Sequence, residues 1–415
     1  MLQDLEDRYR AVTARSRAMM AEAAHFMPGG STRHFGFHAP YPPVFAGGKG
    51  ARIRDVDGNE YVDLVCNGMS LVHGHAFAPA VEAIAAEVRN GWAWPGASAA
   101  QIAFADALAK RFGDGSLVRF TNSGTEAAML AAKVARRVTG RPLILKALQA
   151  YHGSYDDFEA GLWGRGEIPG RTILATFNDI GSFAEALRTH PDQVAAVIIE
   201  PVMVTGGIGL APASFFRELQ ELAHAHGALL IVDDCLMFRL APGGSAQFFG
   251  FEPDITVLGK FIGGGIPVGA VVGSSAVMGD LDPLGGTIHH GGSFNGNVLG
   301  SVAGKATLDA LTAEAIDRMA EQAKQVATSL AGTVAMLDLP VQIERCGSVV
   351  GMGFRDRDDL PGQAARQRFH LACLLNGVYI GTGGTPMVMC TALTDDDIGL
   401  AIEGLRSAMR EAFQA

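Results

Sequence analysis

Short apolar runs and helical patterns alternate through the middle of the chain. Residues 142–146, 194–201, 227–234 and 254–258 are almost continuously apolar, as expected of strands that are covered on both faces. Apolar residues at helical spacing lie between them, most clearly over 213–226. This alternation predicts an α/β fold in which a mostly parallel sheet lies between two layers of helices.

The two ends of the chain have different patterns. Residues 1–26 have the spacing of one amphipathic helix, which Pro28-Gly29-Gly30 ends. Residues 52–64 alternate around Asp57-Gly58, the usual sign of a two-stranded hairpin. After helical patterns over 296–330, short apolar segments and a closing helix over 395–413 predict a smaller α+β domain.

We therefore expect three parts along the chain. Residues 1–64 form an N-terminal helix, loop and hairpin that pack with the small domain. Residues 65–300 form the large domain, and residues 301–415 form the C-terminal small domain.

Composition is that of a globular protein. The 415 residues are 48% hydrophobic and 18% charged, enough for two domains with a large core. The net charge of −10 comes without basic clusters, so we expect neither nucleic acid nor membrane as a partner. Five scattered cysteines predict free thiols and no metal site. No signal-like or membrane-length segment is seen, so we expect a cytoplasmic protein.

One lysine is unusual because its surroundings are apolar and rich in glycine. Lys260 lies within Thr256–Gly269, where an ammonium group must be paired, lose its charge or react. A P-loop is excluded, since its spacing requires glycine at 254 and Ser or Thr at 261, where the chain has Asp254 and Phe261. From this stretch alone, a structural salt bridge and an imine with an aldehyde are equal alternatives.

Two acidic residues stand at the ends of their strands, as Lys260 does. Glu200 lies near the end of the run at 194–201, and Asp233 near the end of the run at 227–234. Ligands of parallel sheets bind at the carboxyl ends of the strands. The coincidence on three successive strands favours a functional site over three unrelated structural roles.

A strand that enters a helix through small residues offers a site for an anion. Leu117–Thr121 precedes Ser123-Gly124-Thr125 and a helical pattern, so free N–H groups and the positive end of a helix dipole face one point. An ordinary helix cap explains the same residues, and taken alone it is the stronger interpretation.

Together these groups suit an aromatic aldehyde that carries a phosphate and a ring nitrogen. Lys260 would form the imine, and Asp233 would keep the ring nitrogen protonated, so that the ring draws electrons from the substrate Cα. Tyr151-His152-Gly153 offers an aromatic ring to stack on one face. Cys235 is placed to pack on the other face, as a small hydrophobic residue rather than a nucleophile.

Several short motifs occur in a specific order from Met27 to the C-terminus. They are Met27-Pro28-Gly29, Asp55-Val56-Asp57-Gly58, Phe120–Ala127, Tyr151-His152-Gly153, Glu200-Pro201-Val202, Leu258-Gly259-Lys260, Ile262–Gly265 and Gly292–Asn297. By these motifs the chain resembles the class III, fold-type I aminotransferases that depend on pyridoxal 5'-phosphate (PLP). Within them it is similar to the branch of glutamate-1-semialdehyde aminomutase and β-phenylalanine aminotransferase.

The resemblance implies a fold-type I architecture with a seven-stranded, mostly parallel sheet, PLP as cofactor, and roles for individual residues. Lys260 would be the Schiff-base lysine and proton shuttle, and Asp233 the partner of the ring nitrogen. The expected cofactor contacts as a set are Ser123, Gly124, Thr125, Tyr151, His152, Glu200, Asp233, Cys235, Lys260 and Ser293. Ser123, Gly124 and Thr125 would form the phosphate cup.

Two further residues extend the implied site. Ser293 matches a threonine that reaches the phosphate from the neighbouring subunit, which implies a homodimer with shared active sites. Arg33 matches an arginine that binds the substrate carboxylate in the β-phenylalanine enzyme, a role that a planar guanidinium suits.

The chain also departs from the family. The usual Asp-Glu-Val triplet is Asp233-Asp234-Cys235 here, and Ser293 replaces the threonine. Gly381–Pro386 contains neither the arginine of the β-phenylalanine enzyme nor the glutamate of the aminomutase, so the substrate pocket differs from both.

The leading hypothesis from the sequence is an aminotransferase. It would move an amino group between an amino acid and an oxo acid. The candidate amino acids include β-amino and aromatic ones. The first alternative is an aminomutase or epimerase that uses the same half-reactions. The second alternative is a binding protein that keeps the fold without the chemistry.

Overall fold

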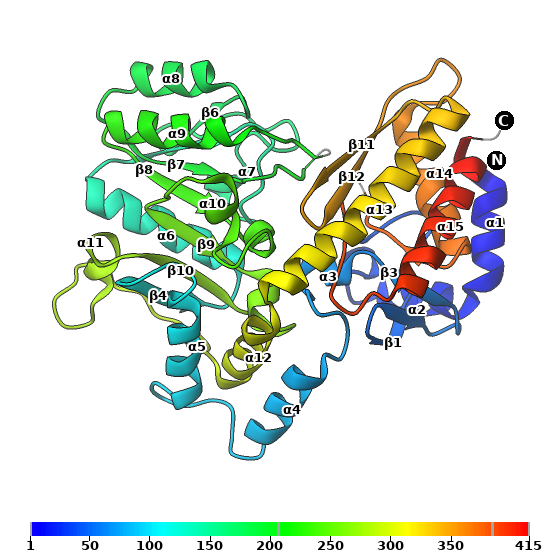
Figure 1. Ribbon diagram of the computed structural model, residues 1–415, viewed down its shortest axis with the longest axis horizontal. Helices are drawn as coiled ribbons and strands as arrows, with labels where there is room; N and C mark the ends of the chain where they lie inside the picture. The colour runs from blue at the N-terminus through cyan, green and yellow to red at the C-terminus, as the bar shows by residue number, and fades with distance from the viewer. Residues whose placement is uncertain (1, 206–207, 383–385, 414–415) are drawn as a thin grey trace. The chain divides into compact units, whose positions relative to one another are not determined.

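The computed structural model describes residues 2–205, 208–382 and 386–413 (Figure 1). Its internal contacts divide the chain into two compact units. Unit 1 comprises the described residues up to Phe77, Ile208, and those from Asp317 onward, and unit 2 comprises 78–205 and 209–316. The domain bounds expected at residues 64 and 300 stay a prediction.

Unit 2 is built on a seven-stranded sheet with the order β4-β10-β9-β8-β7-β5-β6. The strands are β4 (Ser116–Thr121), β5 (Leu143–Ala147), β6 (Thr172–Ala175), β7 (Val194–Ile199), β8 (Leu229–Asp233), β9 (Ile255–Leu258) and β10 (Gly269–Ser274). β10 runs antiparallel to both its neighbours, and the other neighbouring strands pair in parallel. The predicted α/β class and the mostly parallel sheet are confirmed.

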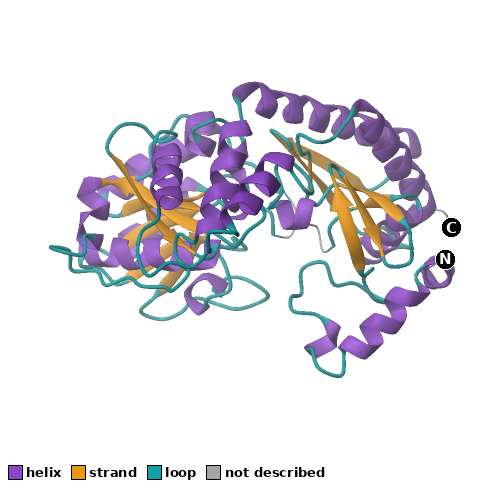
Figure 2. Ribbon diagram, turned by 90° about the horizontal axis from the view of Figure 1, so that it is seen from below, coloured by secondary structure: helices purple, strands orange, loops and turns teal. Residues whose placement is uncertain are grey.

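The helices of unit 2 are α4 (Ala78–Glu87), α5 (Ala99–Ala109), α6 (Gly124–Thr139), α7 (Asp156–Glu159), α8 (Ile180–Thr189), α9 (Ala213–Ala225), α10 (Gly244–Phe249), α11 (Ser275–Met278) and α12 (Val298–Ala310). Of these, α6, α8 and α9 pack on the sheet, whereas α4 packs against α12 (Figures 1 and 2). Helix α13 (Ala313–Leu337) begins in unit 2 and continues into unit 1.

Successive strand residues supply two separate cores, one on each face of the sheet. Ile144 and Ile198 pack with the small apolar side of α6, whereas Leu145 and Val197 pack with phenylalanines of α8 and α9. Each fully buried aliphatic side chain contributes about 1.5–3 kcal/mol. Strands with both faces covered must be apolar at nearly every position, which explains the continuous runs in the sequence.

Unit 1 contains two small sheets. The first has the order β1-β2-β3-β13 and the second β11-β12-β14. The strands are β1 (Phe45–Lys49), β2 (Arg52–Asp55), β3 (Glu60–Asp63), β11 (Val341–Cys346), β12 (Val349–Phe354), β13 (Val378–Tyr379) and β14 (Met387–Val388). The predicted hairpin is confirmed, because β2 and β3 pair antiparallel on either side of Asp57-Gly58. β13 pairs in parallel with β3, which joins the two ends of the chain in one sheet.

The single N-terminal helix predicted over residues 1–26 is wrong. The segment forms α1 (Leu2–Val12) and α2 (Ala14–Ala23), separated at Thr13, whose backbone is not helical. The Thr13 hydroxyl donates to the carbonyl of Tyr9 at 2.6 Å, a local bond that competes with the helix. The remaining helices of unit 1 are α3 (Cys66–Met69), α14 (Gly362–Leu375) and α15 (Asp395–Phe413). Within the described ranges, no helix has the length and apolar content needed to cross a membrane.

Candidate functional site

A cavity of about 170 Å³ opens in unit 2 where the central parallel strands end. Glu200 directly follows β7, Asp233 ends β8, and Lys260 lies two residues beyond β9. These strands are neighbours in the sheet, so the three side chains line one cavity. The remaining lining residues are Ser123, Gly124, Thr125, Tyr151, His152, Gly153, Val202, Val204, Cys235, Leu236 and Met237.

One wall of the cavity is the N-terminus of helix α6. Ser123 is the helix cap, and its hydroxyl accepts a hydrogen bond from the Glu126 N–H at 3.2 Å. The Glu126 carboxylate in turn accepts the Asn122 N–H at 2.8 Å, which fixes the turn from β4 into α6. The cap interpretation of Ser123 is therefore correct. It is compatible with anion binding, because a 16-residue helix directs its positive end toward the cavity.

Two glycines allow the α6 turn and the Lys260 turn to approach each other. A Cβ at Gly124 would lie 2.8 Å from Cys235 Sγ, and one at Gly259 would lie 3.1 Å from the Gly124 Cα. Cys235 is buried and sits against both glycines. Burial raises the pKa of its thiol well above the usual value, so Cys235 is a neutral apolar wall of the cavity.

Asp233 and His152 form a buried pair in this cavity. His152 Nδ1 lies 2.9 Å from Asp233 Oδ2, and the Cys235 N–H donates to Asp233 Oδ1 at 3.2 Å. Burial alone would raise the pKa of Asp233, but the His152 hydrogen bond and the Lys260 charge outweigh it and lower the pKa. Burial lowers the pKa of His152, so its neutral ring donates through Nδ1. Asp233 is thus an ionised carboxylate in an enclosed site.

Glu200 differs from Asp233 in its protonation. Its Oε1 accepts the Tyr151 N–H at 2.5 Å, which fixes the loop that carries Tyr151 and His152. Burial and the nearby Asp233 raise the pKa of Glu200 to about 8, against smaller opposing effects of Lys260 and Lys146. The cavity therefore keeps one carboxylate charged and the other protonated at neutral pH.

Lys260 has an unusual backbone conformation. Its φ of 53° lies in the left-handed region, which costs a residue with a side chain about 1–3 kcal/mol. It begins a short 3₁₀ turn, Lys260–Gly263, directly after the extended Gly259. Strain of this kind persists where the surrounding structure imposes it, and it is frequent at active sites. With this backbone conformation, Lys260 lines the cavity together with Asp233 and Cys235.

Two predicted site residues do not line this cavity. Ser293 lies in the same unit but lines a separate small cavity beside Trp92 and Trp94. Arg33 belongs to unit 1, where it is exposed and its NH2 group donates to Asn67 Oδ1 at 3.2 Å. In the divergent Gly381–Pro386 segment, residues 383–385 lie outside the described residues.

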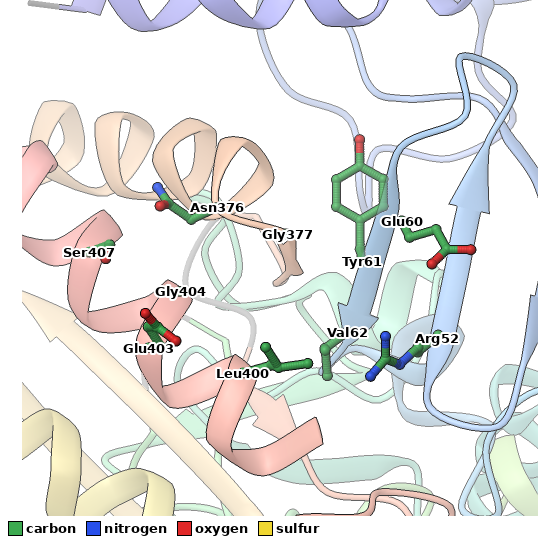
Figure 3. A pocket seen from close by; sticks show the side chains of 10 residues that line it. All are labelled: Arg52, Glu60, Tyr61, Val62, Asn376, Gly377, Leu400, Glu403, Gly404 and Ser407. Carbon is green, nitrogen blue, oxygen red and sulfur yellow. The ribbon is translucent and has the colours of Figure 1, made fainter. Parts of the chain in front are cut away.

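A larger cavity, of about 310 Å³, occurs in unit 1 (Figure 3). Its charged side chains are Arg52, Glu60 and Glu403, and none of the residues predicted for the site lines it. Arg52 Nε already pairs with Asp397 Oδ1 at 2.9 Å. The cavity in unit 2 is smaller, yet it alone of these two combines a lysine, buried carboxylates and a helix N-terminus.

Sequence reasoning did not find every residue that shapes the site. It treated Lys146 as part of a buried strand, although its amine is fully enclosed and contacts the loop that carries Tyr151. It also missed the bond between His152 and Asp233. The signal for Lys146 was present, since it is the only charged residue within the apolar run at 142–146, as Lys260 is in its own stretch.

Comparison with known proteins identifies close relatives over almost the whole chain. The model of the family described as Aminotransferase class-III matches residues 38–158 and 173–409. A glutamate-1-semialdehyde 2,1-aminomutase of Gemmatimonas aurantiaca is 38% identical, over 96% of this chain and 97% of the relative. A transaminase solved with PLP bound has a TM-score of 0.92 and 34% identity, covering 97% of this chain and 98% of its own. A β-phenylalanine aminotransferase of Variovorax paradoxus has a TM-score of 0.91 and 30% identity, covering 98% of this chain and 96% of its own.

Proposed function

Because the chain belongs to the class III aminotransferase family, we propose that it is an enzyme that moves amino groups on small amino acids, with PLP as its cofactor. The observation that carries this proposal is the cavity of unit 2. There an amine, an ionised carboxylate and the N-terminus of a 16-residue helix line one cavity.

The residues of the cavity fit the cofactor group by group. The N-terminus of α6, with Ser123, Gly124 and Thr125, is suited to a phosphate dianion. Gly124 admits no Cβ, since one would lie 2.8 Å from Cys235 Sγ, so a bulkier residue there would disturb the cup. The ionised Asp233 is suited to a protonated ring nitrogen, and Tyr151 and Cys235 offer flat and apolar walls.

When bound, the cofactor supplies an aldehyde carbon to which amines add and a pyridinium ring that draws electrons from the substrate Cα. The protein's own residues then have defined tasks. Asp233 holds the proton on the ring nitrogen, because its carboxylate stays ionised in the enclosed site. Lys260 Nζ supplies the amine and carries the proton from the substrate Cα, as a general base that acts within reach of the bound substrate. His152 orients Asp233 through Nδ1.

Of the two reaction types, intramolecular transfer has the better support. The curated relatives are named glutamate-1-semialdehyde 2,1-aminomutase, with 38% identity in the example above and 31% for that of Methanocaldococcus jannaschii. We therefore place an isomerase of this kind ahead of the aminotransferase that the sequence alone favoured. The substrate would be a small amino aldehyde or amino acid in which the amino group moves between neighbouring carbons.

The aminotransferase is the second candidate. Solved transaminases share 34% and 30% identity with nearly complete coverage, and one of them is a β-phenylalanine aminotransferase. The exposed Arg33 would bind the substrate carboxylate in this reaction.

We also propose a homodimer in which Ser293 contributes to the partner's phosphate site. The cytoplasmic location expected from the sequence stays a proposal.

Dependence on an amino acceptor tests the two candidates directly. The PLP-loaded protein is incubated with glutamate-1-semialdehyde, and separately with α-, β- and ω-amino acids, each with and without an added oxo acid. An isomeric product formed without the oxo acid supports the aminomutase. Catalytic turnover only with the oxo acid supports the aminotransferase and removes the isomerase. Failure of every donor to change the absorption of the bound cofactor would contradict both.

A further inference from the structure

Lys146 is a charged residue in the sheet of unit 2 that the proposed chemistry does not use. It lies on β5, and its side chain is completely buried. Its Nζ donates three hydrogen bonds, to the carbonyls of Ala150 at 2.7 Å, Phe158 at 2.8 Å and Ala160 at 2.6 Å. An ammonium group has three N–H donors, so all of them are used on backbone oxygens.

The three carbonyls belong to the two ends of one loop. Ala150 lies three residues after the end of β5, and Phe158 and Ala160 lie at the last turn of α7. A four-residue helix leaves its final carbonyls without helical partners, and a cation at this end satisfies them. Lys146 therefore joins the beginning and the end of residues 150–160 through a single side chain.

Three residues of this loop, Tyr151, His152 and Gly153, line the cavity, and each has its own contact there. The Tyr151 N–H binds Glu200, and His152 Nδ1 binds Asp233. Gly153 lies so close to Thr125 that a Cβ would be 2.4 Å from its Oγ1. Small shifts of this loop would move the aromatic ring and the Asp233 partner together.

We propose that Lys146 is a positioning residue, whose ammonium group holds the 150–160 loop closed and thereby sets Tyr151 and His152 in the cavity. The part that concerns the cofactor rests on the proposed function. The closure of the loop itself does not.

A salt bridge is not the reason for this lysine. Among the described residues, its hydrogen-bond partners are all backbone carbonyls, and the acidic group that acts on its pKa is Glu200. Burial lowers the pKa of Lys146 to about 8, with Glu200 acting in the opposite direction. Three short bonds to carbonyl dipoles favour the ammonium form, because a neutral amine would leave one of the carbonyls unpaired.

Lys146→Met keeps the length of the side chain and removes all three donors. Hydrogen exchange is measured on the purified full-length apoprotein, so the result does not depend on cofactor binding. We expect faster exchange of amides in 150–160 and unchanged exchange in 254–264, which carries Lys260. Lys110→Met is the matched control, because Lys110 lies on the surface of the same unit with a side chain that is 73% exposed. Uniform loss of protection across unit 2, or no change at 150–160, would overturn the proposal.

Binding of PLP gives the second measurement. We expect the dissociation constant for PLP to be about tenfold higher in Lys146→Met than in the wild type. A loss of this size is typical when a residue that supports a ligand-contacting residue is removed. The PLP dissociation constant of Lys146→Gln, which keeps two N–H donors, should lie between that of the wild type and that of Lys146→Met. If Lys146→Met does not fold, Lys146→Gln carries both measurements alone.

A double-mutant cycle tests whether Lys146 acts through the loop. His152→Ala, Lys146→Met and the double variant are compared for PLP affinity. If Lys146 acts through the loop, Lys146→Met should weaken PLP binding less in the His152→Ala variant than in the wild type. The reason is that the interaction of His152 is already lost in that variant. Full additivity would mean that Lys146 affects binding by another route and would contradict the proposal. If no form of the protein binds PLP, the proposed function fails while the exchange result still decides the role of Lys146.

Discussion

The unit 1 cavity around Arg52 and the unit 2 cavity around Lys260 place charged groups in opposite ways. In unit 1, the cavity of about 310 Å³ is lined by Arg52, Glu60 and Glu403, which are exposed to water. In unit 2, the cavity of about 170 Å³ encloses Glu200 and Asp233, which are 6% and 8% exposed. The larger cavity therefore holds charged groups that water stabilises, and the smaller one holds two carboxyl groups that are shielded from water.

The difference indicates that burial of the acidic side chains, rather than the size of the cavity, marks the reactive site. Charges in water interact weakly with their neighbours, because the high dielectric constant reduces the Coulomb energy. Enclosed charges must compensate one another, and their pKa values separate as a result, with Asp233 lowered and Glu200 raised to about 8. Pairs of titratable groups with separated pKa values are typical of catalytic sites.

The largest effect is expected from Lys260→Ala in the enclosed cavity. Removal of the amine should lower turnover by about 10⁴-fold, since this residue supplies both the covalent bond and the proton transfer. Steady-state rates with the best donor measure the loss. Borohydride reduction followed by peptide mass analysis should show cofactor bound to the Lys260 peptide in the wild type only. Lys110→Ala serves as the control, and normal turnover of Lys260→Ala would refute the assignment.

Much of this site could be predicted from the sequence, because strand ends are set by local pattern. Glu200, Asp233 and Lys260 follow apolar runs, and the parallel arrangement alone brings them to one edge. Ser123 could be predicted for the same reason, because it lies two residues after a strand and directly before a helix.

The remaining features depend on loop conformation, which periodicity does not encode. His152 forms a hydrogen bond with Asp233, which lies 81 residues later in the sequence. Lys146 donates to carbonyls that lie up to 14 residues away in the sequence. The break at Thr13 was missed because a side-chain bond to the Tyr9 carbonyl outweighs a helical pattern of apolar residues.

A medium effect is expected from Glu200→Gln, read as the pH dependence of stability. Burial and the nearby Asp233 raise the pKa of Glu200 from the ordinary 4.5 to about 8 in the folded chain. Lys260 and Lys146 act in the opposite direction, with smaller effects. Between these values the folded state binds one proton more than the unfolded state. Rising pH therefore favours unfolding, by up to about 1.4 kcal/mol per pH unit from this group.

Urea unfolding of the apoprotein at several pH values between about 5 and 8 measures this slope. Glu200→Gln should flatten it, because glutamine does not titrate, while its amide oxygen can still accept the Tyr151 N–H. Glu403→Gln, in the exposed cavity of unit 1, should leave the slope as in the wild type. Equal slopes of unfolding free energy against pH in all three proteins would contradict the comparison, because the buried Glu200 would then titrate no differently from the exposed Glu403.

The smallest effect is expected from Arg52→Met in the unit 1 cavity. Arg52 pairs with Asp397 at 2.9 Å, but its side chain is 47% exposed, so water competes for the pair. Unfolding free energy should fall by less than about 1 kcal/mol, with PLP affinity and turnover unchanged. Arg8→Met is a close control, since Arg8 is also 47% exposed and pairs with Glu411 at 2.8 Å. A loss of turnover in Arg52→Met that Arg8→Met does not share would assign the larger cavity a part in the reaction, and the contrast between enclosed and exposed charges would no longer identify the site.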